Sequence, residues 1–371
     1  MEIPVYQPYF HGNEKLYVNQ CLDSSWISSK GKFIGEFEEK FAQYIGSPFA
    51  TSVCNGTVAL HLALLALDLQ PEDEVIVPTL TYVASVNTII QVGAKPVFVD
   101  SLPDTWQIDP ADVRRKITPK TRAIMAVHLY GHPCDMRALM AICKEHNLLL
   151  IEDCAEAFGT YFQGQHVGTF GDIATFSFFG NKTLTTGEGG MVTMKDQTLY
   201  ARATNLKNQG VSQSLQYWHD IVGYNYRMTN ICAAIGLAQL EKVDEVLAKK
   251  RQLAERYRAG LKNLPLITHD EIGDVRHSFW MCSILLNDAK HRDSLREHLK
   301  SAGIETRPLF YPAHLMSMYQ KPGEQHPVAE SLGSRGINLP SWPGMTAEQA
   351  DKIIQMIREY FSTRASSHAC F

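Results

Sequence analysis

The chain has 371 residues, of which 45% are hydrophobic and 20% are charged, and its formal net charge at pH 7 is −4. This length and composition are typical of a soluble enzyme with two domains, or with one large domain and a smaller one attached. The slight negative charge, without a basic cluster among aromatic residues, argues against a nucleic-acid partner.

Three features of the sequence indicate where in the cell the protein is located. The opening segment MEIPVYQPYF has neither the basic nor the apolar region of a signal peptide. No apolar run reaches the ~18 residues that a membrane span needs. The eight cysteines form no C-x-x-C pair, which argues against a zinc or redox motif and for reduced thiols. We therefore expect a cytoplasmic protein without a metal site and without a membrane partner.

Short β-rich runs alternate with helical patterns over the first half of the chain. Strands that alternate with helices of ~10–15 residues form crossover units, so we predict a mostly parallel seven-stranded sheet covered by helices on both faces. The last two runs are joined by a loop alone, which predicts a tighter connection there. The seven runs are FATSVC (49–54), EVIVP (74–78), PVFVD (96–100), RAIMAVHLY (122–130), LLLIED (148–153), IATFSFF (173–179) and GMVTM (190–194).

The pattern changes after the last of these runs. Residues 228–264 predict one long helix, or two helices joined by a bend, with an apolar first half and an amphipathic second half. Residues 265–363 then mix a β-like run with two further helical patterns. We predict an α/β protein with a large domain of residues 1–240, N-terminal segment included, and a small C-terminal α/β domain of residues 241–371.

Ligands of an open parallel sheet bind beyond the carboxyl ends of its strands. The first predicted strand is followed by Gly56 and Thr57, where a helix begins. Glycine permits close backbone approach, Thr57 is a candidate helix N-cap, and the positive helix end suits a phosphate. The alternative is an ordinary capped helix start that binds nothing.

Two further side chains stand at strand ends. Asp153 closes the fifth strand, and a buried carboxylate is costly unless a cation or a hydrogen-bond donor faces it. The alternative is that Asp153 caps the following turn. Tyr82 stands at the start of the helix after the second strand, where its ring could lie flat on a ligand. Its alternative is packing in the core.

One lysine stands among aromatic and glycine residues in the stretch SFFGNKTLTTGEGGMV (177–192). Ser177 offers a hydroxyl near the end of the sixth strand. The glycines of the stretch let the loop fold back over the sheet, which would bury Lys182. A buried lysine loses hydration, its pKa falls, and it can form an imine and carry protons. The alternative is a solvated lysine in a hairpin loop.

Together, these candidate residues would suit a flat aromatic cofactor. It would have a phosphate at one end, a ring nitrogen facing a carboxylate, an aromatic side chain over the ring and an aldehyde facing an amine. Pyridoxal 5′-phosphate has all of these features. The order of the pieces, with Lys182 placed 29 residues after Asp153, is hard to produce by chance.

The chain resembles the sugar-nucleotide aminotransferases of the DegT/DnrJ/EryC1/StrS family from about residue 3 to about residue 360. This resemblance implies the pyridoxal-phosphate-dependent type I aminotransferase fold, with a large cofactor-binding domain and a small C-terminal α/β domain. The segments that carry it are NGTVALHLAL (55–64), DEVIVPTLTYVAS (73–85), IEDCAEA (151–157), FGDIATFSFFGNKTLTTGEGGM (170–191) and GYNYRMTNICAAIGLAQL (223–240).

The resemblance also implies roles for individual residues. Lys182 would form the imine with the cofactor aldehyde, and Asp153 would pair with the ring nitrogen. Glu156 would lie near the ring hydroxyl, and Tyr82 would stack on the ring. Three residues would hold the phosphate: Gly56, Thr57 and Ser177.

Other residues are implied to act across a subunit boundary or on the substrate. Asn225 would reach the phosphate of a partner subunit, which implies a homodimer with shared sites. Arg227 and His314 are candidates for substrate contacts. Their alternatives are a structural ion pair for Arg227 and a surface loop position for His314.

Five segments are similar to those of family members that aminate GDP-4-keto-6-deoxy-D-mannose, which implies this acceptor and L-glutamate as the donor. Keto-hexoses linked to UDP or dTDP are alternatives, as is a non-catalytic binding or regulatory protein of the same fold. Related 3-dehydratases have histidine in place of Lys182, so the lysine favours aminotransfer. The segments are SSWISSKGKF (24–33), HLYGHPCDM (128–136), QYWHDIVGYNYRMTN (216–230), ETRPLFYPAH (305–314) and RGINLPSWPG (335–344).

Overall fold

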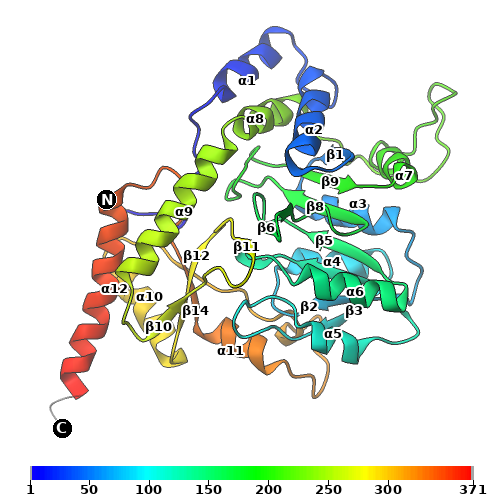
Figure 1. Cartoon of the computed structure of the whole chain (residues 1–371). Coiled ribbons are helices and arrows are strands. Elements are labelled where there is room, and N and C mark those ends of the chain that lie inside the picture. The colour runs from blue at the N-terminus through cyan, green and yellow to red at the C-terminus, as the bar shows by residue number, and fades with distance from the viewer. Residues whose placement is uncertain (1, 369–371) are drawn as a thin grey trace.

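A seven-stranded sheet organises the first half of the chain (Figure 1). The structure is a computed structural model that describes residues 2–368, and the side chains of residues 2–363. All seven predicted apolar runs form strands of this sheet. They are β1 (Phe49–Val53), β2 (Glu74–Pro78), β3 (Lys95–Val99), β4 (Thr121–Val127), β5 (Leu149–Asp153), β8 (Ile173–Ser177) and β9 (Gly190–Met194).

The strand order is β1-β9-β8-β5-β4-β2-β3. The pairs from β8 through β5, β4 and β2 to β3 are parallel, and β9 runs antiparallel to β8 and β1. The loop of residues 178–189 therefore returns the chain beside β8 without a crossover helix, which agrees with the tighter connection that the sequence predicts. The prediction of a mostly parallel seven-stranded sheet is confirmed.

Helices cover both faces of this sheet because successive strand residues point to opposite sides. In β2, Val75 and Val77 pack in one core with α3 and α4, while Ile76 packs in another with α5 and α6. A third core lies over the other end of the sheet, against α2 and α8. These helices are α2 (Lys32–Ile45), α3 (Gly56–Ala66), α4 (Val83–Gln91), α5 (Pro110–Lys116), α6 (Met136–His146) and α8 (Asn230–Leu240).

The helical stretch after the large sheet is two helices. After α8, α9 (Val243–Gly260) begins beyond a two-residue break at Glu241 and Lys242, so the second of the two predicted alternatives is confirmed. The apolar α8 packs between α1 (Glu14–Asp23) and α2, and the amphipathic α9 leads away from the large sheet (Figure 1).

A second, antiparallel sheet lies beside α9, with the order β10-β12-β14-β13. Its core contains residues of α9, α10 and α12, and it also contains Ile3 from the N-terminus. The predicted domain boundary at residue 240 stays a prediction. Because Ile3 packs in this second core, the first residues of the chain contact the C-terminal part. The elements are β10 (Leu266–Thr268), β12 (Cys282–Leu286), β13 (Arg307–Pro308), β14 (Gly336–Leu339), α10 (Arg292–Ser301) and α12 (Ala347–His368).

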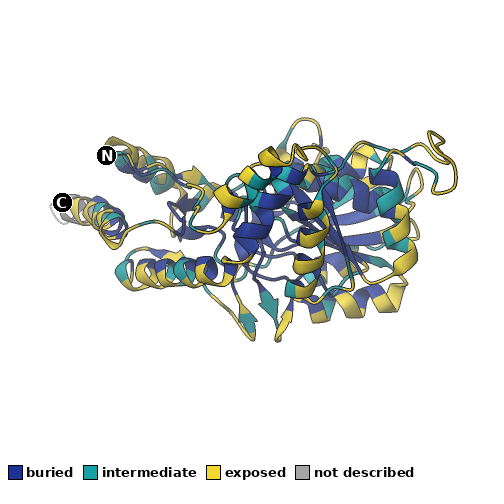
Figure 2. Ribbon diagram, turned by 90° about the horizontal axis from the view of Figure 1, so that it is seen from above, coloured by how far each residue is buried: buried dark blue, intermediate teal, exposed yellow. Residues whose placement is uncertain are grey.

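Viewed from above, the strands of the large sheet are mostly buried, whereas the outer helix faces and a long projecting loop are exposed (Figure 2). The projecting loop follows α7 (Gln197–Lys207) and carries exposed apolar residues, among them Tyr217 at 90% and Val222 at 88% exposure. Across residues 2–368, no helix combines the length and apolar character needed to cross a bilayer.

Candidate active site

A cavity of about 500 Å³ lies at the carboxyl edge of the large sheet, beside the ends of β1, β5 and β8. Ligand sites of open α/β sheets are found at this edge because the loops after parallel strands gather there. The cavity brings together seven of the ten residues proposed from the sequence. They are Gly56, Thr57, Tyr82, Asp153, Glu156, Ser177 and Lys182.

One end of the cavity is the first turn of α3. The side chain of Asn55 accepts the N–H of Val58 (2.9 Å), so the helix cap is Asn55 and the prediction of Thr57 as the cap is wrong. A Cβ atom on Gly56 would lie 2.6 Å from Cβ and 2.7 Å from Oγ of Ser177. Glycine is therefore required for the helix start to approach Ser177. The narrow, positive helix end suits a phosphate.

Asp153 lies at the floor of the cavity, at the end of β5. Its Oδ2 accepts the hydroxyl of Ser85 (2.8 Å) and its Oδ1 accepts the N–H of Ala155 (3.1 Å). Burial raises the pKa of this carboxyl, although both hydrogen bonds and the charge of Lys182 act in the opposite direction. A protonated ring nitrogen placed against it would offset the cost of that burial. The residue therefore fits the predicted partner of a pyridine ring.

Lys182 is held in the folded-back loop between β8 and β9. Backbone bonds from Phe178 to Gly189 (2.8 Å) and from Lys182 to Phe179 (2.9 Å) shape this loop. Burial lowers the pKa of the lysine, although the charges of Glu156 and Asp153 raise it. The solvated-lysine alternative is wrong, because the side chain lines the cavity and is only 14% exposed.

Glu156 faces the lysine, with its Oε1 3.8 Å from Nζ of Lys182. Its other carboxylate oxygen accepts the N–H of Tyr130 (2.8 Å), which fixes the side chain. Burial raises the pKa of Glu156 to about 7, although the charge of Lys182 and the hydrogen bond from Tyr130 lower it. The carboxyl group of Glu156 and the amine of Lys182 therefore interact directly inside the cavity.

Tyr82 precedes α4 as its N-cap residue and borders the cavity. Its side chain is 56% exposed, so the alternative of core packing is wrong. The ring lies 5.7 Å from the ring of Phe310, which also borders the cavity. Stacking of Tyr82 on a bound ring stays a prediction.

Three proposed residues lie outside the cavity. Asn225 is exposed and accepts Nε–H of Arg227 (3.0 Å), and Arg227 also donates to Asn208 (3.2 Å). Arg227 therefore contacts amide side chains, and it forms no ion pair with any side chain of residues 2–363. His314 is buried between Thr79 (2.7 Å) and Glu330 (3.1 Å), so it is not a surface histidine. Contacts of Arg227 and His314 with a substrate stay predictions.

Several cavity residues are missing from the sequence prediction. Trp280 and Phe310 come from the C-terminal half of the chain, and no local motif marks them as neighbours of Lys182. Ser85, which binds Asp153, is one helical turn beyond Tyr82. The tertiary fold alone brings Trp280 and Phe310 to the cavity.

Beneath the cavity, His128, Glu152 and Cys154 lie close enough to share a metal ion. The carboxylate of Glu152 already accepts bonds from His128 (3.1 Å) and from the N–H groups of Gly168 (2.7 Å) and Gly171 (2.7 Å). Burial would raise the pKa of Glu152, but these donors hold it below its ordinary value. We interpret this group as a structural anchor of the loop before β8.

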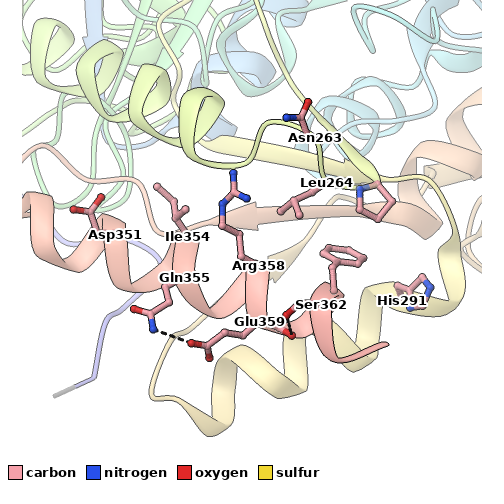
Figure 3. A pocket seen from close by; sticks show the side chains of 11 residues that line it. Asn263, Leu264, His291, Asp351, Ile354, Gln355, Arg358, Glu359 and Ser362 are labelled. Atoms are coloured by element: carbon pink, nitrogen blue, oxygen red, sulfur yellow. Dashed lines mark hydrogen bonds between the residues drawn. The ribbon is translucent and has the colours of Figure 1, made fainter. Parts of the chain in front are cut away.

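A second cavity, of about 860 Å³, lies between the end of α9 and α12 (Figure 3). At its edge Gln355 donates to Glu359 (2.8 Å), and Arg358 donates to the carbonyl of Gly260 (2.7 Å). None of the side chains that line it belongs to the predicted site. The smaller cavity, which holds an amine beside two buried carboxyl groups, is therefore the candidate active site.

Comparisons with known proteins support the family resemblance that the sequence shows. The DegT/DnrJ/EryC1/StrS aminotransferase family profile matches residues 8–358. GDP-perosamine synthase of Escherichia coli O157:H7 is 58% identical over 362 residues, 98% of this chain and 99% of that protein. GDP-perosamine synthase of Vibrio cholerae is 53% identical over 364 residues, 97% and 99% of the two chains. The solved PLP-form of Spr1654 from Streptococcus pneumoniae has a TM-score of 0.93 at 28% identity, covering 98% of this chain and 99% of that one.

Proposed function

The chain belongs to the DegT/DnrJ/EryC1/StrS aminotransferase family, and we propose that it transfers the amino group of L-glutamate to C4 of GDP-4-keto-6-deoxy-D-mannose, giving GDP-perosamine and 2-oxoglutarate. The family, the aminotransferase fold and the pyridoxal phosphate cofactor predicted from the sequence are confirmed. The observation that carries the proposal is the buried amine of Lys182 in one cavity with Asp153 and the Gly56 cradle. The choice of sugar is supported by the names of the relatives.

The residues present fit the cofactor. Gly56, Thr57 and Ser177 would hold its phosphate, and Asp153 would pair with its ring nitrogen. When bound, pyridoxal phosphate supplies an aldehyde that takes up the amino group and a ring that delocalises the electron pair released from carbon. Asp153 keeps the ring nitrogen protonated, and Ser85 and Ala155 hold that carboxylate in place.

Lys182 serves as the acid and base of both half-reactions. Its lowered pKa increases the share of neutral amine, and Nζ would take a proton from the α carbon of the donor and deliver one to the carbon that carries the aldehyde group of the cofactor. Nζ performs the reverse transfers when the keto sugar is the acceptor. Glu156, whose Oε1 lies 3.8 Å from Nζ, is placed to orient the amine.

We further propose a homodimer with shared sites. Asn225 is exposed and lies outside the cavity of its own chain, as a residue that reaches a partner's phosphate would. The projecting loop carries exposed apolar side chains near this residue, among them Tyr217 and Val222. We place the reaction in the cytoplasm, since the seven cysteines within the described residues are free thiols.

The test is a coupled assay for 2-oxoglutarate with L-glutamate and a panel of keto-sugar nucleotides linked to GDP, UDP and dTDP. We expect release of 2-oxoglutarate with GDP-4-keto-6-deoxy-D-mannose and an amino sugar as the second product. Faster turnover of a UDP- or dTDP-linked sugar would change the substrate assignment. A chain that binds these nucleotides but releases no 2-oxoglutarate with any of them would be a non-catalytic member of the family.

A further inference from the structure

We propose that Trp280 is a positioning residue for Lys182: its indole ring holds the lysine amine, and its ring N–H anchors the loop that carries the lysine. Trp280 lies just before β12, in the C-terminal part of the chain, about 100 residues away in sequence. The inference deepens the proposed function and rests on it, because the role of Trp280 is to prepare Lys182 for proton transfer.

The amine is fixed from two directions. Nζ of Lys182 lies 3.9 Å from the centroid of the Trp280 ring and 3.8 Å from Oε1 of Glu156. Trp280 is 4% exposed, so water does not weaken this cation–π contact as it would at the surface. The aromatic face and the carboxylate together define one position for Nζ while it carries the proton that it delivers, whereas a free lysine side chain samples many rotamers.

The same tryptophan also fixes the backbone beside the lysine. Its Nε1–H donates to the carbonyl of Asn181 (2.7 Å), the residue immediately before Lys182. On the other side, the hydroxyl of Tyr6 donates to the carbonyl of Lys182 (2.7 Å). The lysine is therefore held by its side chain and by both neighbouring peptide groups.

Trp280 is itself held rigidly. The buried amine of Lys250 donates to the carbonyl of Trp280 (3.1 Å) and to that of Ser341 (2.9 Å). The ring of Tyr130 lies parallel to the indole at 6.1 Å between centroids, and the same Tyr130 binds Glu156 through its backbone. Tyr130 thus contacts both groups that flank Nζ of Lys182, the indole of Trp280 and the carboxylate of Glu156.

A tryptophan that only fills the core would act differently. Its loss would lower the stability of the fold and leave the surroundings of Nζ unchanged once the protein is folded. Trp342 provides the matched control, since it is also buried, at 5% exposure, but packs in the core of the second sheet. The variants to compare are Trp280→Leu, Trp280→Phe and Trp342→Leu, with folding checked by circular dichroism.

The first readout requires no turnover. The full chain without cofactor is methylated on its lysines with ¹³C-formaldehyde and an amine–borane reductant, and the Lys182 signal is assigned by its absence in Lys182→Arg. In the wild type, the ring current of the indole should move the Lys182 methyl signal upfield of the methyl signals of the exposed lysines. Trp280→Leu should return it to their position, whereas Trp280→Phe should keep part of the shift and Trp342→Leu all of it.

The second readout is steady-state kinetics of the holoenzyme. Trp280→Leu should lower kcat about ten- to a hundredfold, because a misplaced amine transfers protons poorly, and leave KM for the amino donor within about threefold. Trp280→Phe should recover most of kcat. A wild-type Lys182 signal among those of the exposed lysines, or one unmoved in Trp280→Leu, would overturn the proposal, and the wild-type signal decides it even if Trp280→Leu does not fold. A wild type with a shifted signal and no aminotransfer would instead refute the proposed function.

Discussion

Asp153 and Lys182 illustrate how burial sets the chemistry of single side chains. Burial raises the pKa of Asp153 and lowers that of Lys182, and the attraction between their charges only partly offsets either effect. Both changes favour the neutral forms in the cofactor-free chain. A neutral amine is the form that attacks an aldehyde, and a protonated ring nitrogen would favour the charged form of Asp153.

Replacing Asp153 with asparagine keeps the shape of the side chain but removes its charge. We expect kcat for both half-reactions to fall about 10²- to 10³-fold, because the ring nitrogen is no longer held protonated. Single-turnover measurements with glutamate and with the keto sugar test each half separately. Ser85→Ala, which removes one hydrogen bond to Asp153 and leaves the charge, should slow both halves much less. Equal losses in the two variants would contradict this assignment.

Glu156 should control the pH at which Lys182 becomes reactive. The pKa of Lys182 is lowered by burial and raised by the charge of Glu156, so Glu156→Gln should lower it further. The neutral amine then exists at lower pH, and the half-maximal rate of pyridoxal phosphate capture should shift to lower pH. Stopped-flow absorbance with the cofactor-free chain measures this rate. A shift to higher pH would contradict the electrostatic role, and Glu188→Gln, at the cavity wall, is the control.

At the scale of elements, Glu152 joins β5 to the loop that precedes β8. Its carboxylate accepts N–H groups from His128, Gly168 and Gly171, and these hold its pKa below the ordinary value despite its burial. Because the folded-state pKa is depressed, this stabilisation is complete above the unfolded pKa of about 4.3 and is lost as pH falls through the folded pKa.

Glu152→Gln should therefore lower the free energy of unfolding by about 2–4 kcal/mol at neutral pH, since an amide cannot accept all these bonds. The difference from the wild type should narrow in acid. Urea unfolding at several pH values measures it. Glu145→Gln removes an exposed ion pair with Arg114 and should change little. A difference that grows as the pH falls would show that the carboxylate does not act as described.

Local pattern predicted the elements of the large sheet well, because each strand is a short apolar run between helices. Asp153 ends such a strand, and Gly56 and Lys182 lie in the segments after two others, so the sheet edge gathers them. The helix cap was misassigned to Thr57 because neighbouring polar residues compete for that role and only geometry selects Asn55. Trp280 could not be predicted, since its place beside Lys182 depends on how the C-terminal part packs.

At the scale of the molecule, the candidate active site depends on segments from the whole chain. The large sheet supplies Asp153 and Lys182, the C-terminal part supplies Trp280 and Phe310, and Tyr6 comes from the N-terminus. Ile3 also packs in the core of the second sheet, which ties the N-terminal segment to that part. Substitutions in either part should therefore change the reactivity of the same amine.

A shared site predicts complementation between inactive subunits. Lys182→Ala and Asn225→Ala homodimers should each have little activity, whereas mixed dimers should contain one intact site and regain activity. The control mixture of Lys182→Ala with Asp153→Asn should stay inactive, because both residues belong to the cavity of the same chain. Activity assays after mixing and subunit exchange measure the effect. Recovery in the control, or no recovery in the first mixture, would contradict the shared site.

Borohydride reduction of the pyridoxal-phosphate-loaded protein is the most direct test of the central claim, that Lys182 is the amine that holds the cofactor. Reduction converts the bond between the cofactor and the protein amine into a stable one, and peptide mapping by mass spectrometry locates it. We predict a single phosphopyridoxyl group, on Lys182, and none in Lys182→Arg. A label on another lysine, or visible absorbance that survives unchanged in Lys182→Arg, would contradict the account.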